Sequence, residues 1–377
     1  MTQKNCDSFF VASQEQLNQP LLGKSDDETS GNGKKIKAQV SKQIFADKLF
    51  EQNEKPANKI FWIETMFGSL VWGVSSFIYG LLDKQDFAVT CLSWTGFIFI
   101  SLSYKIFEIY STPKSSRQDI FESFIGQMRN KENRWHVAFR SINFFLMIWL
   151  VIQIGDYSQR ANMNYGIILS LNCLSSVFLA IIAWIFFGER FGMITILGML
   201  IVFSGTVLIL VSRSDPKSEE NQRVNIYSEE DRTYYRYLAI IMGVLYACIG
   251  TIRVIQAKFL NKKNGYSPIQ FSIDAAFVCG MILFCISAYY FAVGHPTYTL
   301  YNFGVSFLAS SLTQVWSTVL LRAIVKGVAA PTSAISNTNP IYTTILTAIF
   351  LGLTPNILQF AGMLLSTIGV VIMILLK

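Results

Sequence analysis

Uncharged polar residues interrupt an apolar stretch near the C-terminal end of the chain. Asn337 and Asn339 come just before Pro340, inside an apolar stretch that covers residues 330–352. Proline lacks a backbone N–H and clashes with the carbonyl four positions earlier, so the Ser336 carbonyl is left free at a kink. Two amides beside such a kink offer donors and acceptors to a small polar ligand. The alternative is a packing kink whose amides bond to neighbouring helices.

Other polar and aromatic side chains lie in similar apolar surroundings and could contact the same ligand. Amides and phenols hydrogen-bond polar solutes, and an indole stacks on a ring or a sugar face. Each could instead bond to, or pack against, a neighbouring helix, and the indole could face lipid. The further candidates are Asn172, Gln314, Trp316, Tyr342 and Gln153.

Two charged residues are candidates as well. Arg253 lies about five residues from one end of an apolar stretch. It either extends its guanidinium to the membrane surface or binds an anion in a cavity, which would favour a phosphate- or carboxylate-bearing solute. Asp274 lies near the end of the next stretch and either carries a coupling proton or is paired with a cation.

The candidates belong to a chain dominated by apolar segments. Hydrophobic residues make up 52% of it and charged residues 15%, and the charges gather in the first 59 residues and near 105–136 and 213–236. A helix that crosses a bilayer needs about 20 apolar residues. The composition therefore predicts an all-α polytopic membrane protein, and the net charge of +7 reflects cations on one side of the membrane rather than nucleic-acid binding.

The apolar stretches predict ten transmembrane helices. Residues 1–59 are polar and lack an apolar signal core, which predicts a cytoplasmic and largely disordered tail. The ten expected spans cover residues 61–82, 87–104, 137–156, 165–187, 192–212, 237–258, 269–292, 303–321, 330–352 and 356–376.

The Lys and Arg residues predict the orientation. With the N-terminus in the cytoplasm, 22 of them fall on the cytoplasmic side and seven on the other side. Cytoplasmic loops carry an excess of these residues. We therefore expect both termini in the cytoplasm.

Two helix pairs half a chain apart resemble each other. A shift of 164 positions places residues 170–188 on 334–352 without gaps. Because each half has five spans, an odd number, the second half enters the membrane from the opposite side, which predicts an inverted repeat. Of three matched glycine pairs, the first belongs to the short turns that end these helices, and the other two are interpreted as helix-packing contacts. The glycine pairs are Gly188 with Gly352, Gly198 with Gly362 and Gly205 with Gly369.

The predicted organisation follows from the spans and the repeat. Residues 60–212 form the first five-helix repeat and residues 237–377 the second, joined by a polar linker at 213–236. The loop 105–136 carries an apolar stripe at helical spacing, flanked by cations. It is either an amphipathic helix on the cytoplasmic leaflet or a helix exposed to solvent.

Residues 175–190 and 197–205 resemble the fourth and fifth spans of the drug/metabolite transporter superfamily, in its EamA-like and nucleotide-sugar transporter branches. The second half repeats the pattern with Asn339, Pro340, Gly352, Gly362 and Gly369. The first half departs from it with Ser176, where the family often has proline. The resemblance implies ten helices in two inverted five-helix repeats and carrier-type transport of a small polar solute.

The sequence therefore predicts a secondary transporter of a metabolite, nucleotide-sugar or amino-acid solute by alternating access. The spans contain no catalytic set and no metal-binding motif, which disfavours an enzyme and predicts no cofactor or metal. The alternative is a non-transporting receptor or scaffold. The expected partners are a small-molecule solute and the lipid bilayer, not nucleic acid, and a homodimer is left open. The Golgi, ER, vacuole and plasma membrane remain equal alternatives for location.

Overall fold

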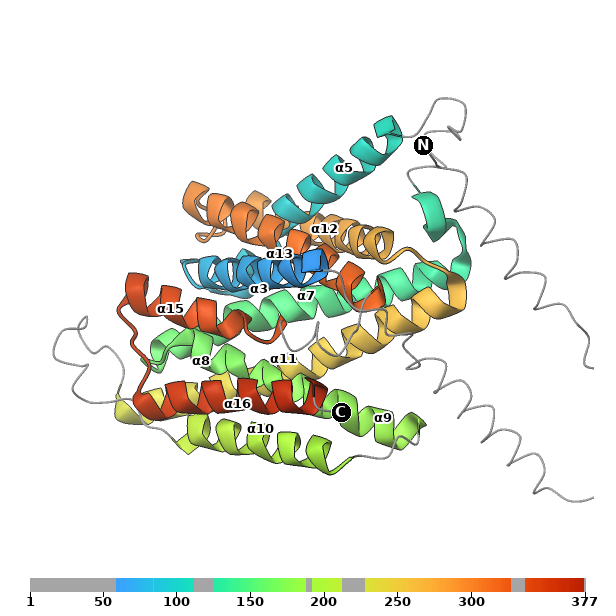
Figure 1. The fold of residues 1–377 in the computed structure, drawn as a ribbon. Coiled ribbons are helices and arrows are strands. Elements are labelled where there is room, and N and C mark those ends of the chain that lie inside the picture. Colours follow the sequence, from blue (N-terminus) through green and yellow to red (C-terminus); the bar gives the residue numbers. More distant parts are fainter. Residues whose placement is uncertain are drawn as a thin grey trace, which may run out of the picture. The chain divides into compact units, whose positions relative to one another are not determined.

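The structure is a computed structural model of the full chain. It describes residues 59–83, 85–111, 125–187, 192–211, 228–326 and 336–375. Within these ranges every regular element is a helix (Figure 1). The predicted N-terminal tail up to residue 58, residues 112–124 of the loop 105–136 and residues 213–227 of the linker 213–236 lie outside the described residues.

The described helices form ten consecutive units. Two of the units are interrupted, because α4 leads into α5 after a short turn and α8 leads through the 3₁₀ helix η3 into α9. In chain order the elements are α3 (Lys59–Tyr79), α4 (Phe87–Cys91), α5 (Trp94–Ser111), η2 (Gly126–Arg129), α7 (Lys131–Arg160), α8 (Tyr165–Leu169), η3 (Ser170–Cys173), α9 (Leu174–Phe187), α10 (Met193–Val211), α11 (Glu229–Asn264), α12 (Pro268–Ala292), α13 (Leu300–Lys326), α15 (Asn339–Leu351) and α16 (Ile357–Leu375).

Several helices are long and apolar enough to cross a membrane. Five of the described helices meet this condition by length and composition, and shorter apolar helices accompany them. The protein is therefore a polytopic membrane protein. The five long segments are Phe87–Ser111, Lys131–Arg160, Glu229–Ala257, Pro268–Ala292 and Leu300–Ala323.

The helices extend beyond the apolar stretches that predicted them. The helix α11 begins at Glu229, inside the segment expected to be the polar linker. Its start carries a reciprocal cap, in which Ser228 Oγ accepts from the Asp231 backbone N–H at 3.2 Å and donates to Asp231 Oδ2 at 2.7 Å. Acidic residues in the first turn also stabilise the helix through a favourable interaction with its dipole. Hydropathy marks the part of a helix that lies in lipid, and capping residues mark where the helix begins.

The regular α-helix is interrupted after α8 and again just before α15. In the first half the α-helix becomes a 3₁₀ helix at residues 170–173, and in the second half a turn at 337–338 precedes α15. Under the shift of 164 residues the two breaks overlap, since Cys173 corresponds to Asn337. Pro340 lies in the first turn of α15, where the missing N–H is tolerated.

The helices α10 and α16 lie side by side and run antiparallel (Figure 1). A Cβ added at Gly205 would lie 2.6 Å from the carbonyl oxygen of Gly362, and one added at Gly369 would lie 2.9 Å from that of Gly198. The later glycine of each helix therefore meets the earlier glycine of the other. The shift of 164 residues converts one contact into the other. Glycine allows this backbone approach, as the sequence predicted.

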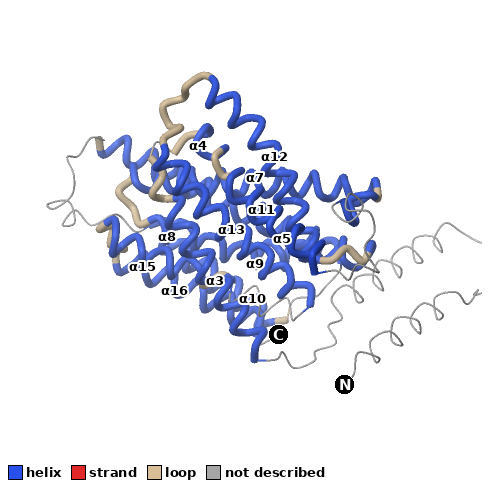
Figure 2. Tube along the Cα trace, turned by 90° about the horizontal axis from the view of Figure 1, so that it is seen from above, coloured by secondary structure: helices blue, strands red, loops and turns tan. Residues whose placement is uncertain are grey.

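The other main helix contacts repeat in the same way. The helix α3 packs along α13, and their counterparts in the other half, α11 and α7, also pack together. The helices α5 and α12 are counterparts that contact each other, and α15, whose counterpart under the shift is α9, packs against α8. The contact of α13 with α5 likewise has a counterpart in the contact of α7 with α12. Both views place α10 and α16 on one side of the bundle and α12 on the other (Figure 1 and Figure 2).

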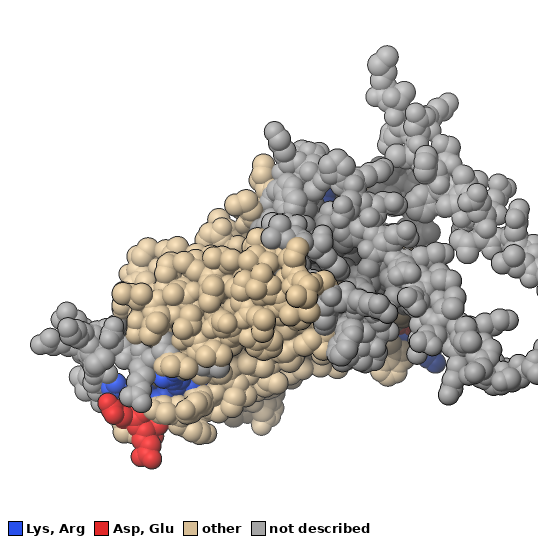
Figure 3. Space-filling model, turned by 60° about the horizontal axis from the view of Figure 1, so that its bottom comes forward, with Lys and Arg blue, Asp and Glu red and all other residues tan. Residues whose placement is uncertain are grey.

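The described surface is suited to lipid. Figure 3 shows a broad face without acidic or basic side chains, and charged side chains gather toward its ends. Many large apolar side chains are exposed, among them Leu200, Phe203 and Ile349. Such a surface is stable only in an apolar environment or against a partner. The protein is an integral membrane protein.

Candidate solute-binding cavity

A small cavity with polar and charged residues among its lining lies between the two halves of the protein. It has a volume of about 60 Å³ and is lined by α7, by η3 and α9, by α11, by α13 and by the segment before α15. Of the nine candidate residues that the sequence singled out, four line it. Its polar and aromatic lining includes Arg140, Asn172, Tyr246, Arg253, Trp316 and Asn337.

Two amides connect the helix breaks at this cavity. Asn172 Nδ2 donates to Asn337 Oδ1 at 3.3 Å, and Asn337 Nδ2 donates to Ser176 Oγ at 3.1 Å. Ser176 corresponds to Pro340 under the shift of 164 residues, so the first half has a hydroxyl where the second half has a proline. This hydroxyl accepts the hydrogen bond from the Asn337 amide of the second half. Within the described chain no donor bonds to Asn172 Oδ1, which remains available to a ligand.

The guanidinium of Arg253 is buried in the protein. The side chain is 5% exposed, so it does not extend to the membrane surface. Its Nη2 donates to Ser317 Oγ at 3.2 Å and its Nη1 contacts the sulfur of Met147. The guanidinium carbon lies 4.8 Å from the centroid of the Phe144 ring and 5.8 Å from that of Trp316. Its Nε has no hydrogen-bond partner among the described residues.

Arg140 is a second buried cation at the same cavity and was not among the residues predicted from the sequence. The side chain is 2% exposed, and its Nη1 donates to the carbonyl oxygen of Arg253 at 2.7 Å. Its guanidinium carbon lies 5.6 Å from the centroid of the Phe271 ring. The signal in the sequence was an arginine inside an apolar helix, a costly position that calls for a partner or a function.

Trp316 contributes an aromatic wall. Its ring stacks on Trp72 with centroids 4.2 Å apart and planes 16° apart. The side chain is buried, so the lipid-facing interpretation is wrong. Its Nε1 donates to no described residue.

Asn339 is buried away from the cavity and stabilises the start of α15. With its amide oriented to satisfy its neighbours, it donates to the Ser336 carbonyl at 2.7 Å and accepts from Trp72 Nε1 at 2.8 Å. The carbonyl that Pro340 leaves without its helical partner is therefore bonded by the Asn339 side chain.

The remaining predicted residues do not line the cavity either. Gln314 Nε2 donates to the Ser272 carbonyl at 3.3 Å, and Gln153 Nε2 donates to the Gln85 carbonyl at 2.9 Å. Tyr342 packs where α15 approaches α3, since a Cβ at Gly73 would lie 2.7 Å from the Tyr342 Cβ. Their roles in binding remain predictions.

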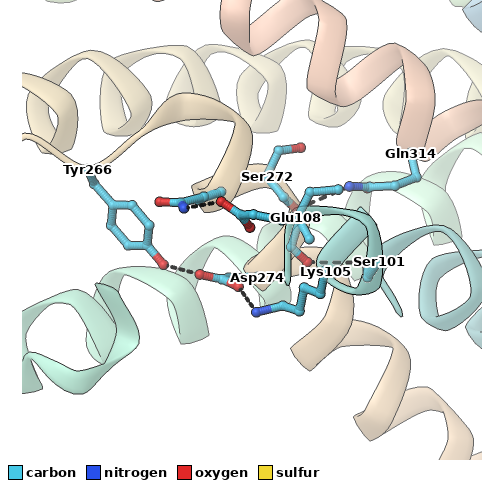
Figure 4. A network of polar contacts seen from close by, with 9 residues as sticks. Ser101, Lys105, Glu108, Tyr266, Ser272, Asp274 and Gln314 are labelled. Atoms are coloured by element: carbon cyan, nitrogen blue, oxygen red, sulfur yellow. Dashed lines mark hydrogen bonds and ion pairs between the residues drawn. The ribbon is translucent and has the colours of Figure 1, made fainter. Parts of the chain in front are cut away.

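A polar network lies between α5, α12 and the loop before α12 (Figure 4). Lys105 Nζ lies 2.6 Å from Asp274 Oδ1, and the Tyr266 hydroxyl donates to Asp274 Oδ2 at 2.5 Å. Burial and the neighbouring Asp274 raise the pKa of the Tyr266 phenol, which keeps it a donor. Asp274 is thus a paired carboxylate, one of the two roles that the sequence allowed.

The network approaches the cavity through hydroxyl groups. Ser272 Oγ lies 3.2 Å from Ser317 Oγ, and Ser317 Oγ accepts from Arg253. Figure 4 shows Gln314 reaching toward Ser272 from α13. The ion pair and the arginine cavity are therefore neighbours.

These observations define a polytopic helical membrane protein with a buried polar cavity at the meeting point of its two halves. Residues 237–375 match the model of the EamA-like transporter family. The chain therefore carries an EamA-like transporter family domain, of the drug/metabolite transporter superfamily, in its second half. Proteins of this family are typically membrane transporters without enzymatic activity.

A solved structure titled only "Crystal structure of protein" has a similar fold. Its TM-score is 0.50 at 12% sequence identity, and the match covers 85% of this chain and 99% of that chain. This likeness concerns the fold alone. No curated protein matches the chain.

Proposed function

We propose that this protein is a secondary transporter that moves a small polar solute across a membrane by alternating access. The observation that carries the proposal is the cavity, because both halves contribute to it at their helix breaks. Transporters with inverted repeats bind their solutes at such discontinuous helices, near the interface of the repeats.

The packing supports an inverted repeat of two five-helix units with ten spans, and the distribution of Lys and Arg supports a cytoplasmic position of both termini. The α10 and α16 glycine contacts are antiparallel and exchange under the shift of 164 residues. The main helix contacts exchange in the same way. Two related halves of opposite direction can rock about a fixed site and expose it to each side in turn.

The solute site in this proposal comprises Asn172, Asn337, Trp316 and Arg253. A volume of about 60 Å³ holds about two water molecules at roughly 30 Å³ each, which is far less than a metabolite needs. Binding therefore requires the lining helices to separate.

A flux assay tests the proposal. The full chain is reconstituted in liposomes, and uptake and exchange are measured with labelled nucleotide sugars, amino acids and phosphorylated sugars. We expect flux of one class and at least a tenfold loss in Asn337→Ala at unchanged expression, because that change removes the partner of Asn172 and the bond to Ser176. Ser204→Ala, which removes an exposed hydroxyl from α10, is the control.

The opposite result is equally informative. A folded protein that moves no class of solute would contradict the proposal and favour the receptor or scaffold alternative. Normal flux in Asn337→Ala would remove the site assignment while leaving transport intact.

A further inference from the structure

The cavity contains two buried cations and no carboxylate. Among the described residues, neither Arg140 nor Arg253 has an Asp or Glu within ion-pair distance, and none of the residues that line the cavity is acidic. Arg140 bonds to a carbonyl, and Arg253 bonds to a hydroxyl and touches a sulfur. These neutral groups accept hydrogen bonds but leave two positive charges uncompensated.

Uncompensated charges in a membrane protein are unfavourable. A buried cation loses its hydration, and two cations at one cavity also repel each other. Such residues in membrane helices commonly belong to substrate or ion pathways. A bound anion would offset both effects.

The unused hydrogen-bonding groups also favour an anion. Arg253 and Trp316 both line the cavity, and the Arg253 Nε and the Trp316 Nε1 are buried without a partner among the described residues. Both are donors only, so they require an acceptor. The planar guanidinium presents its donors in a geometry that fits carboxylate and phosphate oxygens.

We propose that this cavity binds the carboxylate or phosphate group of an anionic solute, with Arg253 as its direct ligand and Arg140 as the second positive charge. The transport part of this inference rests on the proposed function, whereas the anion site does not. The small cavity holds the anionic group, and the rest of the solute lies in the space that opens when the halves separate.

Thermal unfolding of the purified full chain tests the anion site. The protein is held in a neutral detergent and a Tris buffer of low chloride, and matched solutes are added. The pairs are glucose 6-phosphate with glucose and succinate with succinamide, and inorganic phosphate is added alone. We expect an anion to raise the Tm by at least about 2 °C and its neutral partner to leave it unchanged. If no anion differs from its neutral partner, the proposal is overturned.

Variants separate a binding role from a structural one. Arg253→Met is expected to lose the anion-dependent shift and to keep or raise the Tm without anion, because it removes an uncompensated charge. Arg322→Gln removes an exposed cation from α13 and should keep the shift. A lower Tm in Arg253→Met together with an unchanged anion shift would identify the arginine as structural and overturn the proposal.

Arg253→Lys keeps the charge and loses the planar fork, so it provides a test if Arg253→Met does not fold. We expect a smaller anion shift at a Tm close to the wild type. A shift as large as that of the wild type would contradict direct ligation by the guanidinium.

A lipid headgroup also carries phosphate, and a separate arm distinguishes this source. Phosphatidylglycerol and diacylglycerol are added to delipidated protein. Stabilisation by phosphatidylglycerol alone, with no effect of the soluble anions, would overturn the assignment to a solute. Stabilisation by a soluble anion that depends on Arg253 supports it.

Flux distinguishes the inference from the proposed function. Transport of a neutral solute that survives Arg253→Met would refute the anionic class and leave the transporter standing. Anion binding that depends on Arg253, in a protein without flux, would keep the anion site and refute the transporter.

Discussion

Two neighbouring regions of the protein differ in whether their buried cations are paired with a carboxylate. Lys105 on α5 and Asp274 on α12 form an ion pair of 2.6 Å, and Tyr266 donates to the same carboxylate. A short way along the network, Arg140 and Arg253 share a cavity without a carboxylate among the described residues. Both regions are buried between apolar helices.

The difference separates a structural charge from a candidate functional one. A cation that the protein compensates itself holds two helices together and is satisfied in every state that keeps the pair. A cation that the protein leaves uncompensated destabilises the empty cavity, and a ligand of opposite charge relieves it. The contrast yields predictions that differ in size.

The largest effect is expected when the ion pair is broken. Asp274→Ala leaves Lys105 buried without its carboxylate, which should lower the free energy of unfolding by about 3–5 kcal/mol. Thermal unfolding in detergent and chemical unfolding measure the change. The double variant Lys105→Met/Asp274→Leu should recover most of the loss, since no charge is then buried. If the Asp274→Ala protein were as stable as the wild type, the ion pair would not be stabilising, and the proposed difference between the two regions would be contradicted.

A smaller change in stability is expected at the second arginine of the cavity. Arg140→Gln loses the bond to the Arg253 carbonyl and relieves the repulsion between the two cations, so the free energy of unfolding should change by about 1 kcal/mol in either direction. The anion-dependent rise in Tm should fall to less than half of the wild-type value. A loss of stability comparable to that of Asp274→Ala would place Arg140 among the structural charges.

The smallest effect on stability is expected at the C-terminal end of α7. Arg160 Nε lies 2.9 Å from Asp156 Oδ2, but the Arg160 side chain is 38% exposed. Solvent screens such pairs, so Arg160→Gln should lower the free energy of unfolding by less than about 0.5 kcal/mol and leave flux and anion binding unchanged. This variant removes the same charge from the same helix as Arg140→Gln. A defect in anion binding would show that net charge, rather than the cavity, controls the effect.

The sequence predicted the region of the site but not the choice among its polar residues. Asn337 and Asn339 are two positions apart and carried the same expectation. Asn337 lines the cavity and bonds to Asn172, whereas Asn339 points to Trp72 and Ser336. Because the two positions face different sides of the chain at a helix start, the rotation of α15 decides which amide reaches the cavity.

The sequence also did not indicate which charged residues lie close to one another. Lys105 was counted in a cytoplasmic loop, yet α5 continues to Ser111 and places it opposite Asp274. Arg140 and Arg253 lie on α7 and α11, which no local pattern brings together. Arg253 was expected either at the membrane surface or in a cavity, and only the packing of these helices distinguishes the two.

By itself the sequence determined that the chain is a polytopic helical protein with related halves, because each apolar stretch must satisfy its backbone hydrogen bonds within its own helix in lipid. It also predicted helix-packing contacts at the matched glycines, which leave room for a second backbone, and the structure shows that α10 and α16 supply these contacts to each other. The tertiary structure decided which charges are paired and which remain open at the cavity. That outcome depends on how each helix is rotated against its neighbours, and the rotation follows from packing among all the helices rather than from any one stretch of sequence.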